Sequence, residues 1–274
     1  MSKIIRPPVK YHGGKYYLCK WIIEQFPEHE TYVEPFGGAA SVLLNKPRCK
    51  HEVYNDLEYS ISNMMRMLRD EPEAMERELR KMSYEKELYL KLKKTYRSDD
   101  FDCLTPLQQA VITYSVRRMS RGGLCGTFSW SKRISGDNVP AEVHAWLTSL
   151  DQLSLVSDRL QGVEIRNDDA SEVMKEFDSH KTLHYLDPPY PKETRVFKTA
   201  YLEEMTIEDH RRIAQTALSL DGTVAISSYP SKLYEGLFGA WERLEKPIAN
   251  HSSHEKKKET KTEVVWVKPS SNPQ

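Results

Sequence analysis

A strand, a glycine loop and a second strand near the N-terminus constrain the fold of this chain more than any other feature. Residues 31–34 are rich in β-formers and run into Pro35-Phe36-Gly37-Gly38, after which a helix is expected over residues 39–45. A second strand is expected over residues 51–54, ending at Asn55-Asp56. This order predicts a βαβ unit, whose two strands lie parallel in one sheet.

The α/β pattern is interrupted and then returns. Residues 60–150 favour helices, with Leu88, Leu92 and Tyr96 spaced along one helix face and Thr105-Pro106 as a helix start, which predicts a helix to about residue 119. Beyond residue 150 we expect strands over 163–165, 183–186, 223–227 and 262–267, and helices over 170–177 and 206–220. The sequence therefore predicts an α/β sheet with a helical insertion.

Composition sets the class of protein. The chain has 274 residues, of which 39% are hydrophobic and 29% charged, as in globular proteins. No apolar run approaches the roughly 18 residues of a membrane span, and no secretory signal is evident, so we expect a cytoplasmic protein without membrane contact. The four cysteines have no Cys-x-x-Cys spacing, which predicts free thiols and no zinc site.

The tetrapeptide Asp187-Pro188-Pro189-Tyr190 follows a predicted strand and carries the chemistry. Two prolines stiffen the loop, which presents the Asp187 carboxylate, the Pro188 carbonyl and the Tyr190 ring at the carboxyl edge of the sheet. The two acceptors suit the two N–H groups of an aryl amine, and Asp187 or water can take its proton. A base could stack on Tyr190, so Tyr190→Phe is expected to retain activity. The alternative is a plain surface turn.

Three further segments suggest a nucleoside site. Gly37 lies between strand and helix, and Asp56 follows 19 residues later, the spacing of an acid that binds ribose hydroxyls. The Gly-x-Gly-x-x-Gly pattern of dinucleotide sites is absent. The loop from Lys10 to Lys15 could close on an anionic group or could simply be solvated. Asp169 could bind a cofactor's adenine, cap a helix, or do both.

A basic region lies inside the insertion. No acidic residue occurs from Cys103 to Gly136, although the whole chain has a net charge of +0. The region contains Phe128, Trp130 and five cations expected to bind DNA: Arg117, Arg118, Arg121, Lys132 and Arg133. The alternative is a solvated basic loop. The run Lys256-Lys257-Lys258 is interpreted as a solvated turn that could touch DNA.

Taken in order, these motifs resemble the Dam-type, or alpha-group, N6-adenine DNA methyltransferases. That family has an N-terminal Lys-aromatic-x-Gly-Gly-Lys, then Glu-Pro-Phe-x-Gly, a target-recognition insertion, and Asp-Pro-Pro-Tyr. The Arg-Arg-Met-Ser-Arg-Gly-Gly run resembles phage and prophage members. The resemblance implies a doubly wound, seven-stranded Rossmann-like sheet. Residues 1–60 and 150–274 would form the catalytic domain, and residues 61–149 a helical target-recognition domain.

The resemblance also implies ligands and roles. It implies that the cofactor is S-adenosylmethionine and that no metal is needed. Tyr11 and Lys15 would contact this cofactor. Phe36 and Asp169 would contact its adenine, and Asp56 would bind its ribose. Glu34, Pro35, Gly37 and Asp187 complete the expected cofactor site, and Asp187, Pro188 and Tyr190 the catalytic set. The expected substrate is adenine flipped out of double-stranded DNA, bound by a monomer in a bacterial or phage-infected cell.

Three other functions compete with this one. Methylation of adenine in RNA uses the same chemistry, although the insertion favours duplex DNA. Cytosine-N4 enzymes more often carry Ser where this chain has Asp187, which disfavours that substrate. A catalytically inactive DNA-binding relative is disfavoured because all four residues of the Asp-Pro-Pro-Tyr loop are present.

Overall fold

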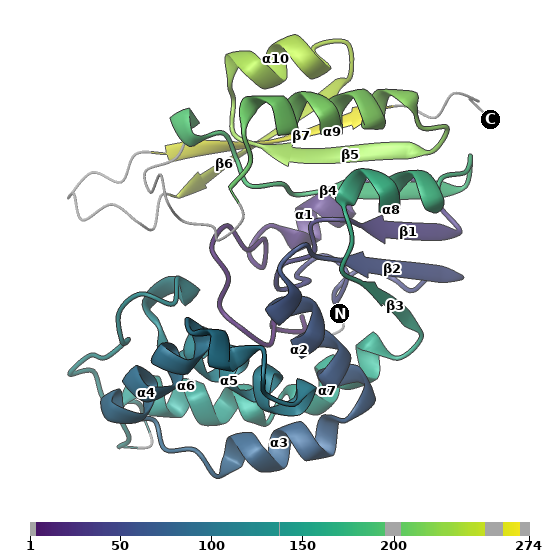
Figure 1. The fold of residues 1–274 in the computed structure, drawn as a ribbon. Helices are drawn as coiled ribbons and strands as arrows, with labels where there is room; N and C mark the ends of the chain where they lie inside the picture. The colour runs from purple at the N-terminus through teal and green to yellow at the C-terminus, as the bar shows by residue number, and fades with distance from the viewer. Residues whose placement is uncertain (1–3, 137, 195–203, 250–259, 269–274) are drawn as a thin grey trace. The chain divides into compact units, whose positions relative to one another are not determined.

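The computed structural model describes residues 4–136, 138–194, 204–249 and 260–268, and the chain divides into two compact units (Figure 1). The first unit comprises Met1–Lys20, Gly38–Lys46 and Glu58–Asn167, and the second comprises Trp21–Gly37, Pro47–Leu57 and Asp168–Gln274. The first unit thus includes N-terminal residues that the sequence assigned to the catalytic domain. The division into catalytic and recognition domains concerns function, and it stays a prediction.

A seven-stranded sheet has the strand order β3-β2-β1-β4-β5-β7-β6, which confirms the Rossmann-like α/β class. β1 is parallel to β2 and β4, and β4 is parallel to β5, whereas β7 is antiparallel to β5 and β6. Every strand expected from the sequence is present, and its observed ends differ from the expected ones by at most two residues. Strand β6 was not predicted from the sequence. The strands are β1 (Thr31–Glu34), β2 (His51–Asn55), β3 (Val163–Arg166), β4 (Thr182–Leu186), β5 (Thr223–Ser228), β6 (Glu242–Ala249) and β7 (Thr260–Lys268).

The core of the second unit lies between its strands and three helices, α8 (Ala170–Glu176), α9 (Ile207–Ser219) and α10 (Lys232–Phe238). Apolar side chains on these helices pack against the buried residues Leu186, Val224, Ile226, Val264 and Trp266 of the strands. Burial of this apolar surface is what fixes the helices on the sheet.

The first unit is mainly helical, as the sequence predicted for residues 60–150. Its central helix α5 (Pro106–Met119) is buried along most of its length and starts with the expected Thr105 cap, reinforced by Gln108 in a capping box. No helix among the described residues is long and apolar enough to cross a membrane. The other helices are α2 (Tyr59–Asp70), α3 (Pro72–Arg80), α4 (Lys86–Tyr96), α6 (Ala141–Leu150) and α7 (Leu153–Leu160), and the short α1 (Cys19–Ile23) spans the boundary between the units.

The helix expected over residues 39–45 is not formed, and this prediction was wrong. The segment is a series of turns that contains only isolated helical hydrogen bonds, such as Leu44 N–H to the Ala40 carbonyl at 2.9 Å. Gly38 and Ala40 have φ of 48° and 56°, in the left-handed region that a right-handed helix cannot contain.

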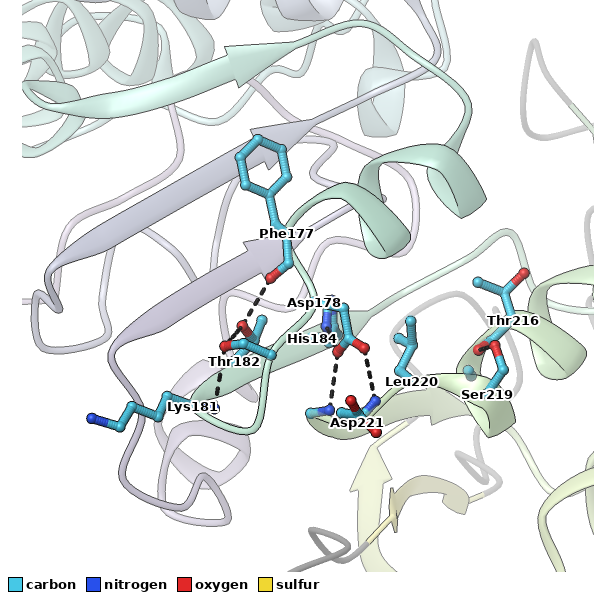
Figure 2. Close-up of polar contacts among 12 residues, drawn as sticks. Phe177, Asp178, Lys181, Thr182, His184, Thr216, Ser219, Leu220 and Asp221 are labelled. Carbon is cyan, nitrogen blue, oxygen red and sulfur yellow. Dashed lines mark hydrogen bonds and ion pairs between the residues drawn. The ribbon is translucent and has the colours of Figure 1, made fainter.

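A polar network holds the amino ends of β4 and β5 together (Figure 2). The Asp178 carboxylate accepts hydrogen bonds from the backbone N–H groups of Asp221 (2.7 Å) and Gly222 (3.0 Å), and lies 3.3 Å from His184 Nε2. A Cβ atom at Gly222 would lie 2.6 Å from the Thr182 carbonyl oxygen, so the close approach requires glycine. The network fixes the edge of the sheet opposite to the carboxyl ends of these strands.

We expect Asp178→Asn to destabilise the fold by about 1–3 kcal/mol at neutral pH, because two backbone amide donors lose a charged acceptor. Burial alone would raise the pKa of Asp178, but hydrogen bonds from His184 and the two amides outweigh it and lower the pKa to about 2. A lowered folded-state pKa stabilises the protein above the unfolded pKa of about 4, and this contribution is lost as the pH falls toward 2.

Urea unfolding of wild type and Asp178→Asn at pH 7 and pH 3 checks this prediction. The difference in unfolding free energy should be smaller at pH 3. The exposed Asp102 provides the control substitution, Asp102→Asn. A stability difference that grows on acidification would contradict the role given to the carboxylate charge.

Candidate active site

The carboxyl ends of β1, β2, β4 and β5 meet at one edge of the sheet in the second unit. These strands are parallel and paired in register, with Glu34 beside Tyr54 and Leu186 beside Ile226. Residues that directly follow parallel neighbours emerge on the same side, where ligands of such sheets bind. The structure therefore brings to this edge the loop after β1, Asp56 after β2 and Asp187 after β4.

Asn55, the last residue of β2, ties three loops together at this edge. Its side-chain amide donates to the carbonyl oxygens of Pro35 and Asp168, both at 3.0 Å, and its side-chain oxygen accepts from Asp168 N–H at 2.8 Å. Its backbone carbonyl accepts from Gly37 N–H at 2.8 Å. One buried amide thus fixes the segments expected to surround a cofactor.

The loop after β1 is tightly packed. A Cβ atom at Gly37 would lie 2.1 Å from Cε2 of Tyr54, so glycine is required here to fit against a ring of the protein itself. Glu34 is buried and accepts a hydrogen bond from the Tyr32 hydroxyl at 2.7 Å. Phe36 is half-buried against the hydrophobic core of this unit, leaving part of its ring exposed.

Asp169 caps α8, which confirms the helix-cap interpretation. Its carboxylate accepts from Ser171 N–H at 2.9 Å and binds Arg212 through both oxygens at 2.8 Å. The hydrogen bond from Arg212 lowers the pKa of Asp169 below its usual value. A contact of this carboxylate with cofactor adenine would compete with Arg212, and that contact stays a prediction.

The Asp187-Pro188-Pro189-Tyr190 loop follows β4 directly. Asp187 is half-buried and Pro188 is buried, so Asp187 is the more exposed residue of this pair. Stiff backbone on both sides of a reacting group holds it in place without flexible side-chain support. This placement agrees with the expected catalytic role of Asp187, which stays a prediction.

The environment of Tyr190 differs from the one expected from the sequence. Its ring is only 6% exposed, and its hydroxyl donates a hydrogen bond to the buried carboxylate of Glu263 on β7. The ring also packs edge-on against Tyr229, with centroids 4.8 Å apart. Burial raises the pKa of Tyr190, and the Glu263 and Asp187 carboxylates raise it further, so the hydroxyl stays protonated. The expectation of an open ring face for a stacked base is corrected, because the ring is enclosed by protein.

The N-terminal loop belongs to the first unit. Lys15 is buried, and its ammonium group donates to the Gly13 carbonyl at 2.8 Å. The Tyr11 ring lies beside Gly38, where a Cβ atom would approach Cε1 of the ring to 3.0 Å. The guanidinium of Arg117 is 4.8 Å from the centroid of the same ring. The loop is therefore packed against other parts of its unit, unlike a solvated tail.

Arg117 is corrected from a DNA contact to a structural cation. Its side chain is 7% exposed and forms an ion pair with Glu58, with Nη2 2.6 Å from Oε2. A buried guanidinium held in this way cannot reach phosphates in solvent. The other four cations remain accessible, with Arg118 half-buried and Arg121, Lys132 and Arg133 exposed.

The two aromatic residues of the basic region differ from each other in exposure. Phe128 packs against Tyr84 and Tyr89, with ring centroids 5.2 and 5.6 Å away, so it anchors the loop. Trp130 is 57% exposed. An exposed aromatic ring beside exposed cations suits a nucleic-acid surface. The run Lys256-Lys257-Lys258 lies outside the described residues.

Three residues with structural roles were not identified from the sequence: Asn55, Glu58 and Glu263. Their partners Asp168, Arg117 and Tyr190 lie 113, 59 and 73 positions away. A signal was present for Glu263, because an acidic residue directly before the apolar run Val264–Val267 requires a polar partner if it is buried. No local pattern marked Asn55 or Glu58.

Comparisons with known proteins agree with this geometry. The DNA adenine methylase of Vibrio cholerae serotype O1 is 28% identical over 243 residues, covering 83% of this chain and 84% of that protein. The DNA adenine methylase of Escherichia coli (strain K12) is 28% identical over 231 residues, covering 77% and 75%. The model of the D12 class N6 adenine-specific DNA methyltransferase family matches residues 11–252. Because this match spans most of the chain, the protein belongs to the D12 class of N6 adenine-specific DNA methyltransferases.

Proposed function

We propose that this adenine-specific DNA methyltransferase uses S-adenosylmethionine, acts at a specific sequence in duplex DNA, and flips the target adenine out of the helix. It works as a monomer and without metal. The observation that carries the proposal is the complete Asp187-Pro188-Pro189-Tyr190 loop at the carboxyl end of β4, with Asp187 partly exposed. An amine inside a base pair is out of reach of such a loop, which is why the base must leave the stack.

The catalytic step follows from the acceptors on this loop. The adenine amine is a weak nucleophile because its lone pair is delocalised into the ring. Hydrogen bonds from its two N–H groups to the Asp187 carboxylate and the Pro188 carbonyl direct the lone pair toward the methyl donor. As the C–N bond forms, the bond between the methyl group and the donor's sulfur would break and leave a neutral thioether. The nitrogen becomes positive and releases a proton to Asp187 or water. Asp187 stabilises this charge while it develops.

The residues near the loop fit a cofactor with adenosine and no phosphates. Asp56 offers a carboxylate for ribose hydroxyls, and the partly exposed Phe36 ring offers an apolar contact for adenine. S-adenosylmethionine supplies a methyl group bonded to a positive sulfur. The N-terminal residues Tyr11 and Lys15 keep the cofactor role that the family resemblance gives them. Glu34 and Pro35 support the loop on which Phe36 is placed.

Asp56→Ala should weaken S-adenosylmethionine binding roughly tenfold or more. A hydrogen bond to a charged group contributes about 1.5–3 kcal/mol, and 1.4 kcal/mol corresponds to tenfold in affinity. Titration calorimetry measures the effect, and Asp56→Asn, which keeps an acceptor oxygen, should lie between alanine and wild type. Wild-type affinity in Asp56→Ala would remove this residue from the cofactor site.

The accessible cations of the basic region should provide DNA affinity. Reversing the charge of Arg118, Arg121, Lys132 or Arg133 should weaken DNA binding and reduce the slope of log K against log salt by about 1 for each phosphate that is no longer neutralised. Cofactor affinity should stay unchanged. Lys175→Glu, at an exposed lysine of α8, is the control with the same change in net charge. Unchanged salt slopes in all four variants would place the DNA surface elsewhere.

One experiment tests the proposed function as a whole. The protein is expressed in cells that lack adenine methylation, and modified bases in their DNA and RNA are sequenced. N6-methyladenine at one recurring DNA sequence is the expected result. Methylated cytosine, or methylation of RNA alone, would overturn the proposal in favour of the competing substrates. Turnover of the purified enzyme in EDTA tests the absence of a metal requirement.

A further inference from the structure

A buried ion pair in the first unit has no place in the mechanism above. Glu58, the residue before α2, and Arg117, on the last turn of α5, have side chains that are 12% and 7% exposed. Two charges removed from water are costly unless hydrogen bonds satisfy them fully. The Glu58 carboxylate of this pair accepts hydrogen bonds from three side chains, whereas Nε of Arg117 is buried without a hydrogen-bond partner among the described residues.

The Glu58 carboxylate accepts from three side chains. In addition to Arg117 at 2.6 Å, Ser60 Oγ donates at 2.6 Å and the Tyr96 hydroxyl at 2.8 Å. Burial alone would lower the pKa of Arg117, but the Glu58 carboxylate outweighs it and raises the pKa, so the guanidinium stays charged. The pair therefore joins the start of α2, the end of α4 and the end of α5.

The guanidinium of Arg117 also contacts the N-terminal loop. It lies 4.8 Å from the Tyr11 ring centroid, a distance at which a cation is attracted to the ring face. Its Nη1 donates to the Gly123 carbonyl at 3.3 Å. A Cβ atom at Gly123 would lie 2.1 Å from the Lys10 carbonyl oxygen, so the loop at residues 121–123 is pressed against the N-terminal loop.

We propose that Glu58 and Arg117 are positioning residues, which hold Tyr11 and the loop from Lys10 to Lys15 in the conformation that binds the methyl donor. This inference rests on the proposed function and deepens it. Arg117 is adjacent to Arg118, and the exposed Arg121 follows just after the end of α5. The same helix end that presents cations to DNA thereby sets the position of the cofactor loop.

The test compares Arg117→Met and Glu58→Gln in the full chain. Each should raise the dissociation constant for S-adenosylmethionine roughly tenfold, because the cation over Tyr11 is removed or displaced. The KM for S-adenosylmethionine should rise more than kcat falls, and DNA affinity without cofactor should stay at the wild-type value. Arg117→Lys, which keeps the positive charge, should recover part of the cofactor affinity.

Arg69→Met is the matched control. Arg69 is also an arginine of the first unit that joins elements, donating to the Val163 carbonyl at 2.6 Å and pairing with Asp70. These partners lie on β3 and at the end of α2, away from the N-terminal loop in the sequence and in the hydrogen-bond network. Arg69→Met should lower thermal stability without changing cofactor affinity. Equal loss of cofactor affinity in Arg69→Met and Arg117→Met would overturn the inference in favour of a purely structural role.

Wild-type cofactor affinity in folded Arg117→Met or Glu58→Gln would also overturn it. If Arg117→Met does not fold, Arg117→Lys and Glu58→Gln carry the same comparison. The proposed function fails separately, when the wild-type enzyme neither binds S-adenosylmethionine nor methylates adenine. If the wild-type enzyme is active and the variants keep wild-type cofactor affinity, the positioning role is rejected and the proposed function stands.

Discussion

Asp187→Asn should lower the turnover of methyl transfer by about 10²–10³, and Asp187→Ala should lower it further. Asparagine keeps the shape and one acceptor oxygen but loses the negative charge that faces the developing positive nitrogen. Removing one electrostatic stabiliser of a transition state typically costs this much in rate. Because the prolines that follow hold the loop, neither substitution should disturb the fold.

A tritium-transfer assay on duplex DNA measures this effect, with circular dichroism and DNA affinity as controls for folding. Asp178→Asn is a matched aspartate substitution at the opposite edge of the sheet. It should lower stability while the folded fraction keeps wild-type turnover. A well-folded Asp187→Ala enzyme with near wild-type turnover would reject the mechanism proposed for this loop, whatever the family of the protein.

Features that depend on residues close together in the chain could be predicted from the sequence. The strands before Pro35, Asp56 and Asp187 were predicted because β-forming runs end in glycine, proline or acidic residues. The Thr105 cap was predicted because a cap depends on residues within one turn. The carboxyl edge of the sheet then followed from the parallel βαβ order, without knowledge of any tertiary contact.

Features that depend on distant partners could not be predicted in the same way. Arg117 lies in a basic run, and nothing within that run indicates that Glu58 neutralises it 59 positions earlier. The helix expected over residues 39–45 was wrong because Gly38 and Ala40 adopt positive φ, a choice made by packing rather than by propensity. The sequence therefore predicted which residues lie at the carboxyl edge of the sheet more reliably than it predicted what each side chain contacts.

Tyr190 provides the sharpest case, because the structure reverses the expectation for Tyr190→Phe. An open ring used only for stacking would tolerate loss of its hydroxyl. In the structure the hydroxyl binds Glu263, and both side chains are buried, with 6% and 2% exposure. The hydrogen bond connects the catalytic loop to β7, so it helps to fix the position of Pro188 and Asp187 at the other end of the loop.

Tyr190→Phe and Glu263→Leu should each reduce kcat roughly 10- to 100-fold with little change in KM for DNA or cofactor. A hydrogen bond to a charged group is worth about 1.5–3 kcal/mol, and each 1.36 kcal/mol at the transition state is tenfold in rate. Glu263→Gln, which keeps an acceptor for the hydroxyl, should lose less. The double variant should be no slower than the slower single variant, since both remove one interaction.

The control is Tyr234→Phe, which removes another buried tyrosine hydroxyl of the same unit, one paired with His210 between α9 and α10. It should cost stability at a level similar to Tyr190→Phe and leave kcat unchanged, because neither Tyr234 nor His210 belongs to the catalytic loop. Full kcat in a folded Tyr190→Phe enzyme would restore the view that the ring alone matters. Additive losses in the double variant would show that Tyr190 and Glu263 act separately, and that the loop is held by its prolines without support from β7.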